Sequence, residues 1–219
     1  MVIIGNNKFQ DFFENKIIIN NNPLLPNPVA NHPDMNICII DDTVFLPKNS
    51  PIFNEISKLK LNIITISENL NNKYPFDVPL NCKAVDDFVI LNPKTVSKEI
   101  LEYCNKNKKI ISVNQGYAAC STLAVSKNVI ITADKGIYTA LKNAGLSPLL
   151  IKEGYIKINE YDYGFIGGAS GFVDNTLYFF GDITLHPDYH KIKDYLAKNN
   201  IKFKYFDGEL LDIGGIIKI

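Results

Sequence analysis

The sequence contains no arginine and no tryptophan, and all 23 of its basic side chains are lysines. An equal number of acidic side chains, 23, brings the formal net charge to zero. A chain without an excess of positive charge offers no broad basic face to nucleic acid or to an anionic membrane. We therefore expect neither as a partner. A small molecule or another protein is expected instead, and a homo-oligomer remains open.

The four cysteines lie far apart and form no C-x-x-C pair: Cys38, Cys82, Cys104 and Cys120. This spacing argues against a zinc site and against a disulfide framework. The sequence also has no apolar run near the roughly 18 residues of a membrane span, and its first residues lack the pattern of a secretory signal. These absences predict a cytoplasmic protein without a bound metal, in which a thiol is free to react.

A unit of two strands, a helix and a third strand recurs along the 219 residues. Four copies can be aligned on the residue after each hairpin turn, which is Val44, Val89, Val129 or Leu177, at steps of 45, 40 and 48 residues. Self-similarity at such a period indicates a repeat architecture. Short apolar strands bounded by Gly, Asn and Asp turns, alternating with amphipathic helices, place the chain in the α/β class.

The two ends of the chain supply parts of a fifth unit. Segment 208–219 has the character of a first strand alone, whereas segment 1–20 supplies a strand, a helix and a strand. Together they predict a fifth blade shared by the termini, within a single domain over 1–219. Such closure would remove the open sheet edge that a terminal unit otherwise exposes.

Two short motifs accompany the repeat: HPDMNICII, with His32 and Asp34, and GYAACSTLAV, with Cys120. With five ββαβ units, they resemble the pentein propeller of the guanidino-group modifying enzymes. That family includes arginine and agmatine deiminases, dimethylarginine dimethylaminohydrolases and amidinotransferases. In it, an H-x-D motif at a strand start and a cysteine of another blade meet on a pseudo-five-fold axis. The resemblance implies a five-bladed pentein propeller of the α/β class.

The resemblance also implies roles for the motif residues, with Cys120 as the nucleophile, His32 as the acid and base, and Asp34 as the third catalytic residue. Cys120 follows His32 by 88 residues, or two units, and the family likewise places its cysteine two blades after its histidine. The family's cysteine usually lies in the last blade. We therefore interpret the chain as a minimal, circularly permuted bacterial member that lacks the long substrate-gripping insertions.

The chemistry of a guanidinium group explains why these residue types are needed. Its carbon is a poor electrophile, and a thiolate suits the attack when a cationic neighbour lowers the thiol pKa and the sulfur is exposed in a cleft. The imidazole would protonate the departing amine and then activate water. Carboxylates would pair with the guanidinium in fork geometry. The expected substrate-binding residues are Asp162, Asp212, Asn114 and Ser170. No metal or organic cofactor is expected.

Each candidate has a structural alternative. Cys120 could be a buried structural cysteine, because free cysteine is among the most buried residue types. Cys82 occupies a similar strand start and is a rival nucleophile, whereas Cys38 and Cys104 fit the core. His32 could be an ordinary loop residue whose backbone is held extended by the proline that follows it.

A second H-P-D motif, at residues 186–188, is better explained as a helix start with Pro187 at the first helical position. The glycines of GFIGGASG form no nucleotide-binding pattern. The alternative function is a non-catalytic binding or assembly protein, like the ribosome anti-association factor that has the pentein fold. The zero net charge weakens a ribosomal role, since contacts with RNA favour lysine-rich faces.

Overall fold

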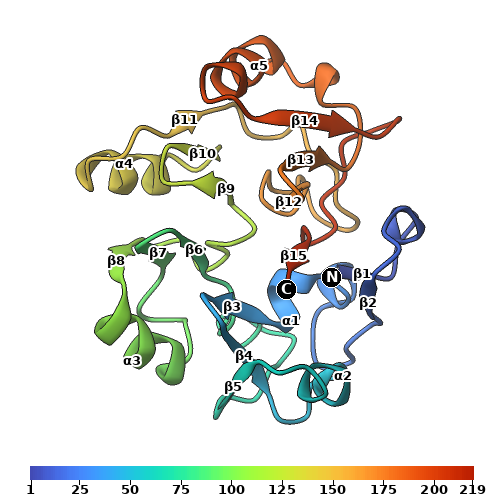
Figure 1. The fold of residues 1–219 in the computed structure, drawn as a ribbon, viewed down its shortest axis with the longest axis vertical. Helices are drawn as coiled ribbons and strands as arrows, with labels where there is room; N and C mark the ends of the chain where they lie inside the picture. The colour runs from blue at the N-terminus through green and yellow to red at the C-terminus, as the bar shows by residue number, and fades with distance from the viewer.

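The computed structural model describes residues 1–219. Its strands form five separate sheets of three strands each, arranged as blades around a central axis (Figure 1). In every sheet the middle strand pairs antiparallel with one neighbour and parallel with the other. The α/β class and the five-bladed arrangement predicted from the repeat are therefore confirmed.

Four blades follow the chain in the predicted order of strand, turn, strand, helix and strand. Their strands are β3 (Cys38–Ile40), β4 (Thr43–Pro47) and β5 (Asn62–Ile66); β6 (Lys83–Val85), β7 (Phe88–Leu91) and β8 (Lys109–Ser112); β9 (Thr122–Ser126), β10 (Val129–Thr132) and β11 (Leu149–Leu150); and β12 (Ser170–Val173), β13 (Thr176–Phe179) and β14 (Lys202–Tyr205). Three hairpin turns begin with a positive φ, at Asp41 (53°), Asp86 (50°) and Asp174 (47°). Aspartate tolerates this left-handed conformation, which matches the twist of a hairpin.

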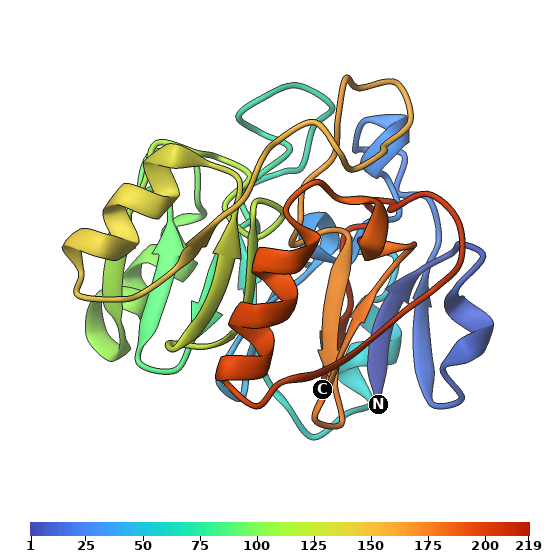
Figure 2. The ribbon, with the colours of Figure 1, turned by 90° about the horizontal axis from the view of Figure 1, so that it is seen from above.

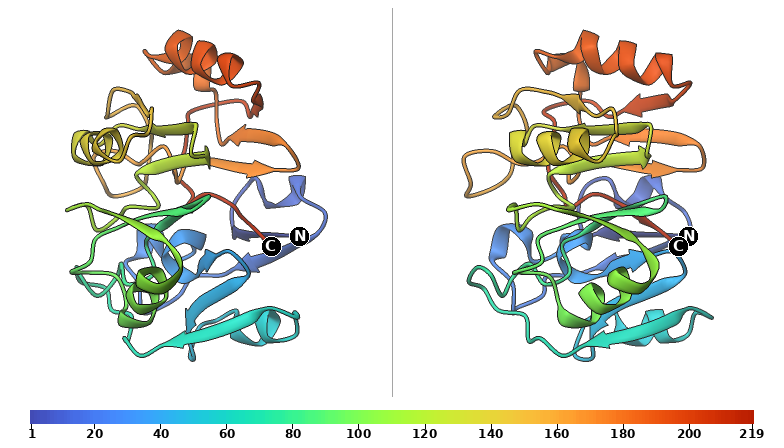
Figure 3. Two further views of the ribbon diagram at one scale, coloured as in Figure 1. Left: turned by 60° about the vertical axis from the view of Figure 1, so that its left-hand side comes forward. Right: turned by 90° about the vertical axis from the view of Figure 1, so that its left-hand side faces the viewer.

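The helices connect the two parallel strands of each blade, because a parallel pair needs a crossover. They are α2 (Phe53–Ser57), α3 (Lys98–Asn107), α4 (Lys135–Asn143) and α5 (Tyr189–Lys198), and they lie on the outside of the ring (Figures 1 and 3). Ser97 and Asp134 accept hydrogen bonds from the first turns of α3 and α4, which stabilises both helix starts. No helix has the length and apolar character needed to span a membrane.

The fifth sheet contains both ends of the chain. Strand β15 (Ile217–Lys218) pairs antiparallel with β1 (Val2–Gly5), and β1 pairs parallel with β2 (Lys16–Ile19). A short 3₁₀ helix, η1 (Gln10–Phe12), takes the place of the crossover helix. Every sheet nevertheless keeps two edge strands, so the expectation that closure removes the open edge is wrong.

The core is divided among the boundaries between neighbouring blades. Each of five apolar clusters joins two adjacent sheets, and the largest contains 17 buried residues. In that cluster Phe45 of β4 and Val89 of β7 pack with Ile100 and Cys104 of α3. Cys38 belongs to the same cluster, so Cys38 and Cys104 are core residues as expected. Because the apolar side chains gather between the blades, the axis is left for polar groups.

Two local predictions differ from the structure. The HPDM segment does not open a strand, because helix α1 (Pro33–Asn36) forms one turn before β3, with Pro33 at its first position. Proline favours that position because its φ is already helical and its missing N–H would be unpaired there. At the second H-P-D motif, η3 (Ile183–Leu185) precedes the motif, and α5 begins only at Tyr189. Pro187 therefore lies outside the helix that it was expected to start.

Candidate active site

The beginnings of the first strands bring polar side chains together at the axis. Blade by blade, the segments that lead into these strands carry Asp34 before β3, Asn81 before β6, Cys120 before β9 and Asp212 before β15. All four side chains are buried. The segment before β12 contributes Gly168, where an added Cβ would lie 1.9 Å from Asp212 Oδ1. A side chain at that position would displace the carboxyl group.

His32 and Asp212 form the most direct pair of the site. His32 Nδ1 lies 3.7 Å from Asp212 Oδ1, and both side chains are almost inaccessible. The Asp212 carboxylate accepts hydrogen bonds from the backbone N–H groups of Phe165 at 2.8 Å and Gly214 at 3.0 Å. Gly214 has a φ of 73°, and a Cβ there would lie 2.2 Å from the Cβ of His32. Only glycine allows this close approach.

Burial sets the protonation of the pair. Burial lowers the pKa of His32, and the Asp212 carboxylate opposes this shift. Burial also raises the pKa of Asp212, while His32 and the two backbone N–H groups oppose that shift. His32 is therefore a neutral imidazole at neutral pH and can accept a proton.

Asp34 is held in its neutral form. Its side chain is enclosed, and burial together with the neighbouring Asp212 raises its pKa to about 8. The Oδ1 atom of Asp34 has no hydrogen-bond partner. A carboxylic acid that keeps its proton at neutral pH can donate a hydrogen bond, or it can ionise when a cation binds beside it.

Cys120 lies next to Asp34, and hydrogen bonding between the two affects the pKa of each. The residue is only 3% exposed, and burial, Asp34 and Asp212 raise its thiol pKa well above the ordinary value. The sequence analysis expected an exposed thiol of lowered pKa. The structure contradicts both points, because the charged groups that act on the thiol, Asp34 and Asp212, are acids, and the polypeptide covers the sulfur.

Asn81 is a residue that the sequence analysis missed. Its Nδ2 donates to Cys120 Sγ at 3.0 Å and to the backbone oxygen of Asp34 at 3.1 Å, and its Oδ1 accepts from Ala119 N at 2.7 Å. It thus ties the Asp34 and Cys120 segments together and lowers the pKa of the thiol. The repeat could have located it, since it lies 39 residues before Cys120, close to one unit.

One cavity joins the reactive groups under a cover of loops. This loop cavity has a volume of about 140 Å³ and is lined by Val29, His32, Tyr117, Cys120, Ile158, Tyr161, Tyr163, Phe165 and Asp212. Segments around residues 20–30, 69–79 and 152–165 rise on the same side of the ring (Figure 2). The Tyr117 hydroxyl donates to Asp77, and its ring stacks on Phe165 with centroids 6.2 Å apart. The sequence offered no periodic signal for this aromatic cover.

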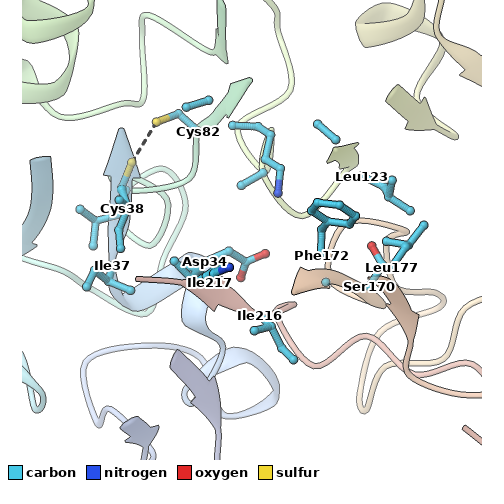
Figure 4. Close-up of a pocket in the computed structure, with 18 residues that line it drawn as sticks. Asp34, Ile37, Cys38, Cys82, Leu123, Ser170, Phe172, Leu177, Ile216 and Ile217 are labelled. Atoms are coloured by element: carbon cyan, nitrogen blue, oxygen red, sulfur yellow. Dashed lines mark hydrogen bonds between the residues drawn. The ribbon is translucent and has the colours of Figure 1, made fainter. Parts of the chain in front are cut away.

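A second cavity lies between the first strands of all five blades. This strand cavity has a volume of about 260 Å³ and is lined by residues of β3, β6, β9, β12 and β15 and by Asp34 of α1 (Figure 4). Ser170 lines it too, and its hydroxyl donates to Ile166 O at 2.8 Å. Ser170, an expected substrate-binding residue, thus lines the strand cavity and not the loop cavity that contains Cys120.

The other predicted residues lie apart from Cys120 or have other neighbours. Asp162 is exposed and does not line either cavity. Asn114 is also exposed and lines a separate surface pocket. Cys82, the rival nucleophile, is buried with its sulfur 3.2 Å from that of Cys38 (Figure 4). No cluster of three or more histidine, cysteine or acidic side chains is arranged to hold a metal ion.

Comparison with known proteins places the chain in a family. Residues 5–217 match a profile described as a family of unknown function (DUF6873). The chain belongs to this family. No curated protein matches this DUF6873 member in sequence at a significant level.

Solved structures resemble the DUF6873 protein in fold. A dimethylarginine dimethylaminohydrolase adduct has a TM-score of 0.58 at 7% identity, over 94% of this chain and 91% of the other. The Pseudomonas aeruginosa dimethylarginine hydrolase, a mutant complexed with citrulline, gives 0.54 at 7% identity, over 88% and 74% of the two chains. Agmatine deiminase of C. jejuni gives 0.52 at 12% identity, over 94% and 75%. The pentein fold expected from the sequence is thus confirmed.

Proposed function

We propose that the protein is a guanidino- or amidino-group modifying enzyme with Cys120 as its covalent nucleophile. The observation that carries the proposal is that Cys120, His32 and Asp212 line one cavity of about 140 Å³. Attack on a guanidinium carbon needs a thiol, a group that handles protons and a carboxylate that holds the cation. Proteins of the same fold include an agmatine deiminase and a dimethylarginine hydrolase complexed with citrulline, which supports this substrate class.

The loop cavity suits a planar cation. Its only ionisable carboxyl is Asp212, no lysine lines it, and several aromatic rings form its cover. A guanidinium pairs with carboxylates through two parallel hydrogen bonds and is attracted to the face of an aromatic ring. Its positive charge would favour the ionised forms of Asp34 and Cys120 and so lower the pKa of both groups. The substrate itself would then supply the cation that activates the thiol.

The proposed reaction proceeds in two steps. His32 accepts the proton of the Cys120 thiol, and the resulting thiolate adds to the guanidinium carbon and forms a C–S bond. The C–N bond to the leaving amine then breaks as His32 passes that proton to the amine nitrogen. A water molecule, deprotonated by His32, then adds to the same carbon, and the C–S bond breaks to release a ureido product and the thiolate. An amine in place of water would make the reaction an amidino transfer.

Mass spectrometry tests the proposal. The wild-type protein is incubated with agmatine, arginine and dimethylarginine, and ureido products and adducts on the Cys120 peptide are measured. We expect turnover or a covalent adduct with at least one compound, and loss of both in Cys120→Ser. Cys104→Ser is the matched control, because Cys104 is a buried core cysteine on α3. Turnover that persists in Cys120→Ser would refute the nucleophile assignment.

The burial of the thiol favours a second candidate, a non-catalytic pentein that binds a small cation. Cys120 is 3% exposed and its pKa is raised, so the protein without ligand holds no reactive thiolate. In that case calorimetry would detect binding of a guanidino compound to the wild-type protein and to Cys120→Ser with similar affinity, and neither protein would form an adduct.

A further inference from the structure

The strand cavity contains a lysine that nothing in the protein satisfies. Lys83, the first residue of β6, is half-buried and lines this cavity, yet its Nζ makes no hydrogen bond or ion pair. Lys108 shows the usual arrangement, because its side chain is 7% exposed and its Nζ pairs with Asp41 and donates to Asp86 O. The Lys83 amine is not one of the fully buried polar atoms, so it is open to the cavity and can meet a ligand there, whereas the Lys108 amine already has protein partners.

The groups around Lys83 locate its amine within the cavity. Burial lowers the pKa of Lys83, while Asp34, Cys120, Cys38 and Cys82 act to raise it. These four side chains therefore lie within electrostatic range of the amine. Asp34 and Cys82 are not ready ionic partners: burial holds the pKa of Asp34 at about 8, and the hydrogen bond with Cys38 together with burial raises the pKa of Cys82.

Asp34 supplies a second unpaired group. It is 8% exposed, it lines the strand cavity, and its Oδ1 has no hydrogen-bond partner. The rest of the wall is mainly apolar and includes Ile37, Leu123, Phe172, Leu177 and Ile216 (Figure 4). The cavity thus combines one unpaired lysine, one carboxylic acid able to donate a hydrogen bond and a hydrocarbon surface, while its other lysine, Lys218, is paired with Asp174.

We propose that the strand cavity is a second binding site, distinct from the loop cavity, for a small monocarboxylate with a hydrocarbon body. The ligand carboxylate pairs with the Lys83 ammonium and accepts a hydrogen bond from Asp34, and its chain packs on the apolar wall. Because Lys218 is already paired with Asp174, a single free ammonium remains, and it matches one negative charge. A phosphate dianion would need more donors than Lys83 and Asp34 provide. A cationic ligand would be repelled by Lys83. The site does not depend on the proposed enzymatic activity.

Isothermal titration calorimetry with hexanoate, hexanol and hexylamine tests the site. We expect saturable binding of hexanoate to the wild-type protein and no measurable binding of hexylamine. Lys83→Met should weaken hexanoate binding by about tenfold or more, which corresponds to about 1.4 kcal/mol or more. Lys218→Met is the matched control and should bind as the wild type does, because Lys218 also lines the cavity but is exposed and paired with Asp174.

A second variant keeps the test decisive if Lys83→Met fails to fold. Ala124→Leu adds apolar volume to the wall without changing any charge, and it should also reduce hexanoate binding. Circular dichroism confirms that each variant is folded. The proposal is overturned if wild-type protein does not bind hexanoate, or if both variants bind it unchanged. Hexanoate binding is measured without turnover, so a failure of the proposed enzyme chemistry is distinguishable from a failure of this site.

Discussion

The neutral carboxyl of Asp34 predicts an unusual dependence of stability on pH. Its pKa in the folded protein is about 8, compared with an ordinary value of 3.8, because burial and Asp212 disfavour the charged form. A group whose pKa is raised on folding stabilises the protein fully below the ordinary value, and this stability is lost as the pH rises through the folded value. Each pKa unit corresponds to about 1.4 kcal/mol, so at neutral pH the loss reaches about 4 kcal/mol as an upper figure.

Asp34→Asn removes this titration while keeping nearly the same shape. The variant should therefore be more stable than the wild type at neutral pH by about 2–4 kcal/mol, and the difference should shrink towards about pH 4. Urea unfolding at several pH values measures the effect. Asp162→Asn is the control, because Asp162 is exposed, and should change stability by less than about 0.5 kcal/mol. A difference between Asp34→Asn and wild type that stays constant with pH would refute the reasoning.

Two further predictions concern the framework of the site. Asn81→Ala should destabilise the protein by about 2–4 kcal/mol in urea unfolding, because it leaves the buried N–H of Ala119 and the buried oxygen of Asp34 unpaired; an effect no larger than that of the exposed control Asn114→Ala would contradict it. Removal of residues 213–219 deletes β15 and two buried isoleucines worth about 1.5–3 kcal/mol each, and should unfold the single domain predicted over 1–219. An unchanged melting temperature would exclude a fifth blade shared by 1–20 and 208–219.

The repeat made the fold accessible from the sequence. The hairpin turns at Asp41, Asp86 and Asp174 have the same local chemistry in each copy, and local chemistry is what a sequence displays directly. The strands after these turns then fix the order of the blades. The helical turn at Pro33 was missed because four residues are too few to show a helical period. A proline close to a strand is also compatible with either a helix start or an extended segment.

The residues of the candidate site could be predicted only where their spacing matches the repeat. His32 and Cys120 lie two units apart, and both line the loop cavity. Asp162 was chosen for its place before a glycine segment, yet it is exposed on a loop whose path no periodicity determines. The raised pKa of Cys120 also could not be foreseen, because it depends on the burial and on the carboxyls that distant blades bring to the sulfur.

The five strand starts hold different residues at corresponding places of a repeated backbone, with Asp34, Asn81, Cys120, Gly168 and Asp212 each contributed by its own blade. A chain of repeated structural units thus has an asymmetric centre, since the five corresponding positions carry an amide, a thiol, two acids and a glycine. Each blade has its own apolar boundary with its neighbours, so one axial residue can diverge without rebuilding the other four. These five positions could therefore be randomised together in a library while the rest of the sequence stays constant. Variants that bind new small molecules could then be selected from it.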